Sequence, residues 1–274
     1  MGKFDRYRDP QPLLPGNRPG TTAISTGRAA EEIAKAEARA VDLKAADKLI
    51  FGNPAHVAIV LDATGSMAHL LEATKEALGE IIGRVSREAG RPIEIELFVY
   101  RDYDVPNDLL ERSGRTTQPQ RLVGWLSGVR ALGGGANDGE AIEAALEAIL
   151  ADGTFGVVLL AGDEPSNSAA TVAAAKRNGR AAKDLASVFG ERKVPIHSFV
   201  VGGDPRTQAD FRAISERSGG KSGRMDGSRE MIDLAVMAIL NCLKGATSVR
   251  KYMDGTRLSA NARSFGQQLL LDKG

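Results

Sequence analysis

The chain has 274 residues, of which 42% are hydrophobic and 26% are charged, so it is long enough for one large core and has the composition of a globular protein. Its formal net charge of +1 excludes a strong overall field that would attract nucleic acid or an acidic membrane. The single cysteine, Cys242, excludes an intramolecular disulfide framework and lies in an apolar run that predicts a buried thiol. We find neither a membrane span nor a secretory signal and expect a cytoplasmic protein.

The first 53 residues differ in composition from the rest of the chain. Residues 1–25 are rich in proline, glycine and arginine and lack periodicity, which predicts an extended arm. From about residue 26 to residue 50, alanines and charged side chains carry a thin apolar stripe, which predicts a helix. Residues 1–53 are therefore expected to form an N-terminal arm followed by a surface helix.

Strands and helices are expected to alternate from residue 54 onward, which predicts an α/β domain with a mostly parallel sheet and helices on both faces. The expected strands are residues 57–61, 93–100, 157–161 and 196–201. The expected helices are residues 68–89, 119–132, 139–151, 171–189, 208–217 and 229–243, the fourth of them kinked or split at Asn178 and Gly179. A further helical pattern follows in residues 262–271. We therefore expect a domain over residues 54–245 and a C-terminal extension over residues 246–274.

A group of oxygen-bearing residues follows the first expected strand. Asp62, Thr64 and Ser66 occupy alternate positions in the sequence DATGS. If the turn directs them to one point, they supply half of the octahedral oxygen shell that Mg²⁺ prefers, at about 2.1 Å from the ion. Ligands also bind at the C-terminal ends of strands in open parallel sheets. The alternative is a turn in which Asp62 and Ser66 only cap the following helix.

Further segments occur in order after this loop: VYRDY at 99–103, GGGAND at 133–138, LLAGDEP at 159–165, IHSFVVGG at 196–203 and SGGKSGRMD at 218–226. Together with DATGS they resemble the von Willebrand factor A (vWA) domain of the intracellular bacterial type. DATGS itself is similar to the metal-ion-dependent adhesion site (MIDAS) of that family. The resemblance implies a Rossmann-like vWA fold over residues 54–245. It adds one short antiparallel edge strand, expected within residues 108–119.

The resemblance also implies a Mg²⁺ site, with Mn²⁺ or Ca²⁺ as alternatives, built from three loops. The aspartate and the two hydroxyl residues of DATGS match the ligands of the first loop. In the second loop, Ala136 stands where the family has a threonine or an aspartate. Asn137 or Asp138 could then serve as the ligand if the loop is shifted by one residue, and an ungapped alignment favours Asp138, unless Asp138 only caps a helix that begins at residue 139. Asp163 matches the aspartate of the third loop, which acts through a water molecule.

In the vWA family, an aspartate or glutamate of a partner protein completes the coordination of the ion, so the metal bridges two proteins. Arg101 could clamp such a partner carboxylate through two hydrogen bonds. Its alternative is an internal ion pair, with Asp102 or at a helix end. The residues expected on the rim of the site are Met67, His69, Arg101, Asp102, Tyr103, Asn137 and Glu164.

Sequence patterns of the common hydrolases and nucleotide-binding enzymes are absent. Position 64 is threonine where a haloacid-dehalogenase-type phosphatase needs a second aspartate, and neither GxSxG nor GxxxxGK[ST] occurs. We therefore predict a non-enzymatic, Mg²⁺-dependent protein-binding module that acts as an adaptor or regulator. Family analogy suggests an AAA+ ATPase, a kinase or another product of the same gene cluster as its partner.

A second hypothesis assigns a structural role to the chain. In it, the two terminal extensions join subunits by self-association, and Ala136 weakens the metal site. Binding to nucleic acid is not expected, because the charge is neutral and no stripe of arginine and lysine interleaved with aromatic residues is present. We expect no membrane association.

Overall fold

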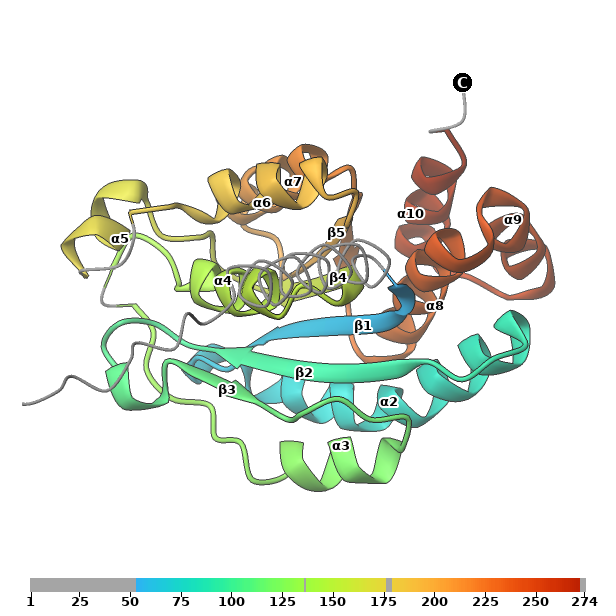
Figure 1. Cartoon of the computed structure of the whole chain (residues 1–274), viewed down its shortest axis with the longest axis horizontal. Coiled ribbons are helices and arrows are strands. Elements are labelled where there is room, and N and C mark those ends of the chain that lie inside the picture. Colours follow the sequence, from blue (N-terminus) through green and yellow to red (C-terminus); the bar gives the residue numbers. More distant parts are fainter. Residues whose placement is uncertain (1–52, 136, 176–178, 272–274) are drawn as a thin grey trace, which may run out of the picture. The chain divides into compact units, whose positions relative to one another are not determined.

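The computed structural model describes residues 53–135, 137–175 and 179–271 (Figure 1). Our predictions for the N-terminal arm and helix, and for the position of Ala136, lie outside these residues. One sheet contains six strands in the order β3-β2-β1-β4-β5-β6. They are β1 (Asn53–Asp62), β2 (Glu94–Tyr100), β3 (Leu110–Arg112), β4 (Phe155–Gly162), β5 (Ile196–Val201) and β6 (Ser222–Met225).

Five of these strands are parallel, and the short edge strand β3 pairs antiparallel with β2. The helices are α2 (Ala68–Ala89), α3 (Pro119–Leu126), α4 (Ile142–Asp152), α5 (Ala169–Ala174), α6 (Ala182–Glu191), α7 (Pro205–Ser218), α8 (Ser228–Lys244), α9 (Ala246–Gly255) and α10 (Ala260–Leu271). Two single 3-10 turns, Gly65–Met67 and Pro106–Asp108, complete the described elements. The predicted α/β fold class, with a mostly parallel sheet, one antiparallel edge strand and helices around it, is confirmed.

The sheet separates two apolar cores because successive side chains of a strand point to opposite faces. In β1, Val57, Ile59 and Leu61 pack with the side chains of α2, α3, α8 and α10. Ala58 and Val60 pack on the other face, with α4, α6 and α7. All five residues are fully buried. A central parallel strand covered on both faces is necessarily an uninterrupted apolar run, which is why β1 could be predicted from the sequence.

In two of the predicted helices, one end belongs to a loop in the structure, because backbone groups there form hydrogen bonds between loops. The helix expected over residues 119–132 ends at Leu126, and the N–H of Leu132 donates to the carbonyl of Ala63 at 2.9 Å. The helix expected from residue 139 begins at Ile142, because the N–H of Glu140 donates to the carbonyl of Pro165 at 2.9 Å. The helix expected over residues 171–189 is divided into α5 and α6, as the Asn-Gly pair predicted.

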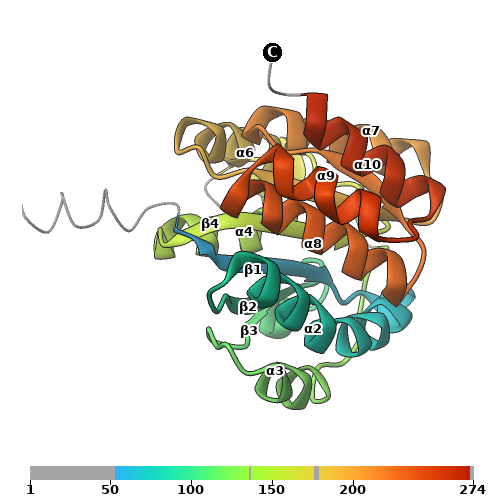
Figure 2. The same cartoon turned by 90° about the vertical axis from the view of Figure 1, so that its right-hand side faces the viewer.

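The C-terminal residues 246–271 belong to the same core as the rest of the domain. Val249 of α9 and Phe265 and Leu269 of α10 are buried in the cluster that also contains α2 and α8. The helices α8, α9 and α10 lie together in Figure 2. The segment predicted to extend beyond the domain is therefore part of its packing. Within the described residues, no helix combines the length and the apolar character that crossing a membrane requires.

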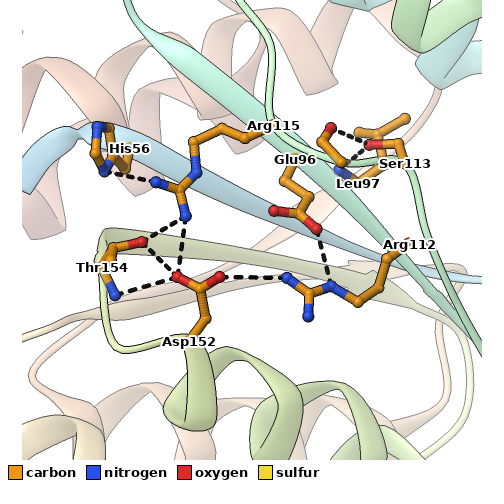
Figure 3. A network of polar contacts seen from close by, with 9 residues as sticks. His56, Glu96, Leu97, Arg112, Ser113, Arg115, Asp152 and Thr154 are labelled. Carbon is orange, nitrogen blue, oxygen red and sulfur yellow. Dashed lines mark hydrogen bonds and ion pairs between the residues drawn. The ribbon is translucent and has the colours of Figure 1, made fainter.

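Charged residues at the N-terminal ends of the strands form a paired network (Figure 3). Asp152, at the end of α4, accepts hydrogen bonds from Arg115 at 2.9 Å and from Arg112 at 3.3 Å. Arg112 also pairs with Glu96 of β2 at 2.8 Å. Burial alone would raise the pKa of Asp152, but a hydrogen bond from Thr154 and the charge of Arg115 lower it. The network therefore joins β2, β3, the segment after β3, and the turn between α4 and β4.

Candidate metal centre

Three loops meet at the C-terminal edge of the sheet and are joined through their backbones. The N–H of Gly65, in the first loop, donates to the carbonyl of Gly133 in the second at 3.0 Å. The bond from Glu140 to Pro165 joins the second loop to the third. Gly134 has a positive φ of 95°, and a Cβ there would lie 3.0 Å from the Cβ of Thr64. Glycine at this position therefore allows the second loop to pass directly over the first.

The two carboxylate oxygens of Asp62 differ in their hydrogen bonding. Its side chain is fully buried at the end of β1, and its Oδ1 accepts hydrogen bonds from the N–H and from the hydroxyl of Thr64, both at 2.7 Å. Its Oδ2 is buried and has no hydrogen-bond partner among the described residues. An ionised oxygen without a partner in the interior is costly, which indicates that a ligand belongs there.

Two further carboxylates lie beside Asp62. One oxygen of each of Asp62, Glu140 and Asp163 lies within 4.8 Å of the others. Glu140 is almost fully buried, and its Oε2, like Oδ1 of Asp163, is buried with no hydrogen-bond partner in the described part of the chain. Each of the three loops thus contributes one carboxylate to the group, and each carboxylate has one buried oxygen without a hydrogen-bond partner among the described residues.

Burial changes the protonation of Asp62 and Glu140. Burial is the largest cause that raises the pKa of Asp62 and of Glu140, and their mutual contact adds to the rise for Glu140. Burial also raises the pKa of the Tyr100 hydroxyl well above its usual value, followed by the charge of Asp62. Like charges in a dry site either bind protons or require a cation.

Tyr100 and Gly162 form the floor of the cluster. A Cβ at position 162 would lie 2.6 Å from the hydroxyl oxygen of Tyr100 and 3.3 Å from Oδ2 of Asp62. The hydroxyl of Tyr100 is itself buried without a hydrogen-bond partner among the described residues. Glycine at the end of β4 therefore leaves the space in which the tyrosine hydroxyl approaches the acidic cluster.

The donor set fits a hard divalent cation. Mg²⁺ and Ca²⁺ take carboxylate, hydroxyl and water oxygens, and the cluster offers carboxylates with the hydroxyl of Thr64 beside them. A cavity of about 400 Å³ opens above the cluster, lined by residues that include Thr64, Ser66, Glu140 and Glu164. An ion in the cluster would thus be reached from solvent through a pocket large enough for a side chain of another molecule.

Asp138, the predicted second-loop ligand, is not part of the carboxylate cluster, although it lines the cavity above it. It is exposed, and its Oδ1 accepts a hydrogen bond from the hydroxyl of Thr171 at 2.8 Å and another from the N–H of Ser168 at 3.4 Å. The hydrogen bond from Thr171 is the largest cause that lowers its pKa. Asp138 does not cap α4, which begins at Ile142. The second-loop carboxylate in the cluster is instead Glu140, which our sequence analysis did not identify.

Three residues predicted for the rim are buried. Met67, Arg101 and Asp102 are at most 1% exposed, so they do not form an exposed rim. The Arg101 guanidinium pairs with Glu111 at 2.8 Å and donates to backbone carbonyls. This agrees with the alternative prediction of an internal ion pair. Pairing of Arg101 with Asp102 in particular is not seen. Arg101 is therefore occupied inside the protein.

The carboxylate of Asp102 holds two loops together instead of facing a partner. It accepts hydrogen bonds from the side-chain amides of Asn137 at 2.7 Å and Asn167 at 2.9 Å. Asn137 belongs to the second loop, and Asn167 follows the third. Asp102 thus fixes the spacing of the loops that carry Glu140 and Asp163.

The remaining predicted rim residues reach the surface to different degrees. His69 is exposed, and its Nδ1 lies 3.2 Å from the carbonyl of Ser66, a predicted metal ligand that is exposed as well. Tyr103 is half-buried and its hydroxyl donates to Glu143. Glu164 pairs with Arg206 at 3.6 Å at the edge of the cavity. A molecule that enters the cavity therefore meets side chains of both charges.

No family model and no curated protein matches the chain. Among solved structures, it is similar to the conserved hypothetical protein BatB from Bacteroides thetaiotaomicron, with 15% identity and a TM-score of 0.47 over 69% of this chain and 98% of that one. Proximal thread matrix protein 1 from the mussel byssus gives 15% identity and a TM-score of 0.48 over 68% of this chain and 45% of that one. The VWA domain of SpRpn10 gives 10% identity and a TM-score of 0.45 over 66% of this chain and 93% of that one. This chain spans less than half of the mussel protein, and the fold assignment rests on its own strand order.

Proposed function

We propose that this protein is a non-enzymatic module that binds a protein partner in a manner that depends on a divalent cation, with Mg²⁺ as the first candidate. The observation that carries the proposal is the group of three carboxylates, each with one buried oxygen that has no hydrogen-bond partner among the described residues, beneath an open cavity. Buried charges of one sign without partners are characteristic of sites that take up a ligand. The vWA resemblance supports the same function, with the site corresponding to a MIDAS.

The residues that would hold the ion come from the first and third loops and from Glu140. Asp62 offers its free Oδ2, and Asp163 and Glu140 each offer a buried unpaired oxygen. Thr64 and Ser66 are the hydroxyl candidates. Asp138 stays a candidate only if its bond to Thr171 breaks. A bound divalent ion would supply positive charge that attracts an anionic oxygen of the partner.

Glu140 competes with an incoming partner carboxylate. Three ionised carboxylates exceed the charge of a divalent ion by one, so a fourth carboxylate would meet a site that is already negative. An aspartate or glutamate of the partner therefore binds best when Glu140 is protonated or displaced. This competition would make partner binding weaker, and more easily reversed, than in a site with two carboxylates.

The adaptor role beside an AAA+ ATPase, a kinase or another gene-cluster protein rests on the vWA resemblance. The scaffold alternative needs both terminal extensions free to join subunits. Within the described residues, α9 and α10 are packed into the core of their own domain, which leaves this alternative dependent on the N-terminal region. The metal-dependent module is therefore the function that we favour.

The test combines ion binding with partner capture. Calorimetry with Mg²⁺, Mn²⁺ and Ca²⁺ would measure affinity, and Asp62→Ala is expected to weaken it by more than about 100-fold, since even outer-shell changes cost about 10- to 100-fold. Capture of a partner from host lysate is expected in Mg²⁺ and lost in EDTA or with Asp62→Ala.

The matched control is Asp184→Ala, which removes an exposed carboxylate that neither belongs to the cluster nor lines the cavity. It is expected to retain both ion binding and partner capture. If Asp62→Ala binds the ion as well as the unchanged protein does, the proposed function is wrong.

A further inference from the structure

A second concave surface lies at the opposite edge of the sheet from β3. A groove of about 410 Å³ runs along β6, between α7 and α10. Its floor is formed by residues 220–224, and Gln208 and Arg212 of α7 line one wall. Asn261 and Gln268 of α10 line the other. We call this surface the β6 groove. It shares no lining residue with the cavity above the carboxylate cluster.

The backbone of β6 presents unused hydrogen-bonding groups to the β6 groove. The N–H of Ser198 in β5 donates to the carbonyl of Lys221 at 3.1 Å, and Ser198 pairs in register with Ser222. In a parallel ladder, residues bond alternately to one side and the other, so Lys221 and Gly223 face β5. The N–H and C=O groups of Ser222 and Arg224 therefore point away from the sheet. No backbone bond to another described residue uses them.

The groove is positively charged. Arg212 and Arg224 both line it, are exposed, and form no ion pair with another described residue. Lys221 and Glu216 also line the groove, one of each sign, so its excess positive charge comes from the two arginines. The remaining lining side chains are mostly amides and hydroxyls. A negatively charged chain with its own backbone donors and acceptors would complement both features.

Phe265 closes the bottom of the β6 groove. A Cβ at Gly223 would lie 3.3 Å from the ring of Phe265, so the absence of a side chain there lets α10 approach the strand closely. Phe265 is fully buried. The floor is thus a fixed strand braced by a helix, and its open edge is pre-formed.

We propose that β6 binds an extended acidic segment of a partner protein, which adds to the sheet as a seventh strand. Backbone hydrogen bonds to Ser222 and Arg224 would supply the register, and the arginines would select acidic side chains at alternate positions. Addition of a strand is favoured over binding of nucleic acid, because the outward groups alternate donor and acceptor as only another backbone does. This proposal does not depend on the metal site.

The test uses a synthetic peptide of about seven residues in which glutamate alternates with valine, a length typical of a strand. We expect the peptide to bind the full chain and to slow hydrogen exchange at the amides of Ser222 and Arg224. The same peptide with N-methyl groups on the residues that pair keeps its charge but cannot form the ladder. We expect it to bind about tenfold more weakly or not at all.

Two variants separate the contribution of backbone hydrogen bonds to peptide binding from that of the positive charge. Ser222→Pro removes one outward N–H without removing a bond to β5, and proline is tolerated on an edge strand. Arg212→Glu combined with Arg224→Glu reverses the charge of the groove. Each is expected to weaken peptide binding by about tenfold or more. Arg263→Glu changes an exposed arginine of α10 that does not line the groove, and is expected to have no effect.

Several results would overturn the proposal. Absence of binding would do so, as would equal binding of the N-methylated peptide, which would indicate attraction by charge alone. Equal binding by folded Ser222→Pro would exclude addition of a strand. Concentration-dependent self-association that occludes the amides of Ser222 and Arg224 would show that a second copy, and not an acidic partner, covers the groove. All of these results can be measured in EDTA, so they do not depend on whether the proposed metal site binds an ion.

Discussion

The carboxylates at the two ends of the sheet differ in whether they are paired with cationic side chains. At the C-terminal end, Asp62, Glu140 and Asp163 lie together and form no ion pair with another described residue, and burial raises the pKa of the first two. At the N-terminal end, Asp152 is paired with Arg112 and Arg115, and its pKa is lowered (Figure 3). The carboxylate at the paired end is neutralised by arginines of the protein, whereas the carboxylates at the acidic end favour the binding of a proton or a cation. The difference separates a structural network from a binding site within one fold.

The acidic end should become more stable when one of its charges is removed. Glu140→Gln keeps the size of the side chain and a hydrogen-bond donor for Asp62, as the protonated acid would. We expect the metal-free protein at neutral pH to gain about 1–3 kcal/mol in free energy of unfolding, the usual cost of a buried polar group left unpaired. Denaturant unfolding in EDTA would measure the gain.

The same change should weaken ion binding, because it removes a candidate ligand, and should ease the approach of a partner carboxylate. Glu164→Gln is the control, since Glu164 lines the same cavity but is outside the cluster. A Glu140→Gln protein that is less stable in EDTA would contradict the view that the cluster is electrostatically unfavourable.

The two ends of the sheet should also contribute to stability with opposite dependences on pH. A carboxyl whose pKa is raised in the folded protein stabilises it below the unfolded pKa of about 4, and this stabilisation is lost as pH rises through the folded pKa. The metal-free acidic end should therefore weaken the protein between about pH 5 and about pH 8. We expect the rise in Tm caused by Mg²⁺ to grow over this range, by about 2–4 °C per kcal/mol. Thermal unfolding with Mg²⁺ or EDTA at each pH checks this.

The lowered pKa of Asp152 has the opposite consequence. Its contribution is present above the unfolded pKa of about 4 and is lost as pH falls through the lower folded pKa. A Mg²⁺-dependent rise in Tm that is constant from about pH 5 to about pH 8 would show that the cluster does not change its protonation.

The smallest expected effect is at the paired end. Asp152→Ala removes a carboxylate that is 22% exposed from two arginines, and we expect a loss of about 1 kcal/mol, because solvent screens partly exposed pairs. Asp184→Ala is the control. Asp184 is 59% exposed and lies 3.8 Å from Arg217, so its change should have almost no effect on denaturant unfolding. Equal losses in free energy of unfolding for the two variants would show that the network stabilises the protein no more than an isolated ion pair does.

The sequence predicted the frame of the molecule well, because the frame depends on local patterns. The apolar run before Asp62 is β1, and the helix expected over residues 68–89 has the bounds of α2. Asn178 and Gly179 fall in the interval between α5 and α6, where Gly179 has a positive φ of 67°. Each of these features is determined by residues that are neighbours in the chain.

The second loop could not be predicted in the same way, because its conformation depends on a segment far away in the sequence. A Cβ at Gly139 would lie 2.5 Å from the carbonyl oxygen of Pro165, so the two loops are in close contact there. This contact delays the start of α4 and places Glu140 in the cluster. The one available signal was a glutamate directly after Gly139 and before the apolar run of α4. Helix periodicity assigns such a residue to a first turn.

The space for an ion in the cluster depends on the absence of a side chain at Gly162. Even the methyl group of alanine at that position would press on the hydroxyl of Tyr100 and on Asp62, although Gly162 itself donates nothing to the cluster. A single methyl group could thus close the pocket of the ion while every candidate ligand is still present in the sequence. Inspection of ligand residues alone would count such a natural variant as functional, so position 162 has to be read together with them when related sequences are sorted into active and inactive forms.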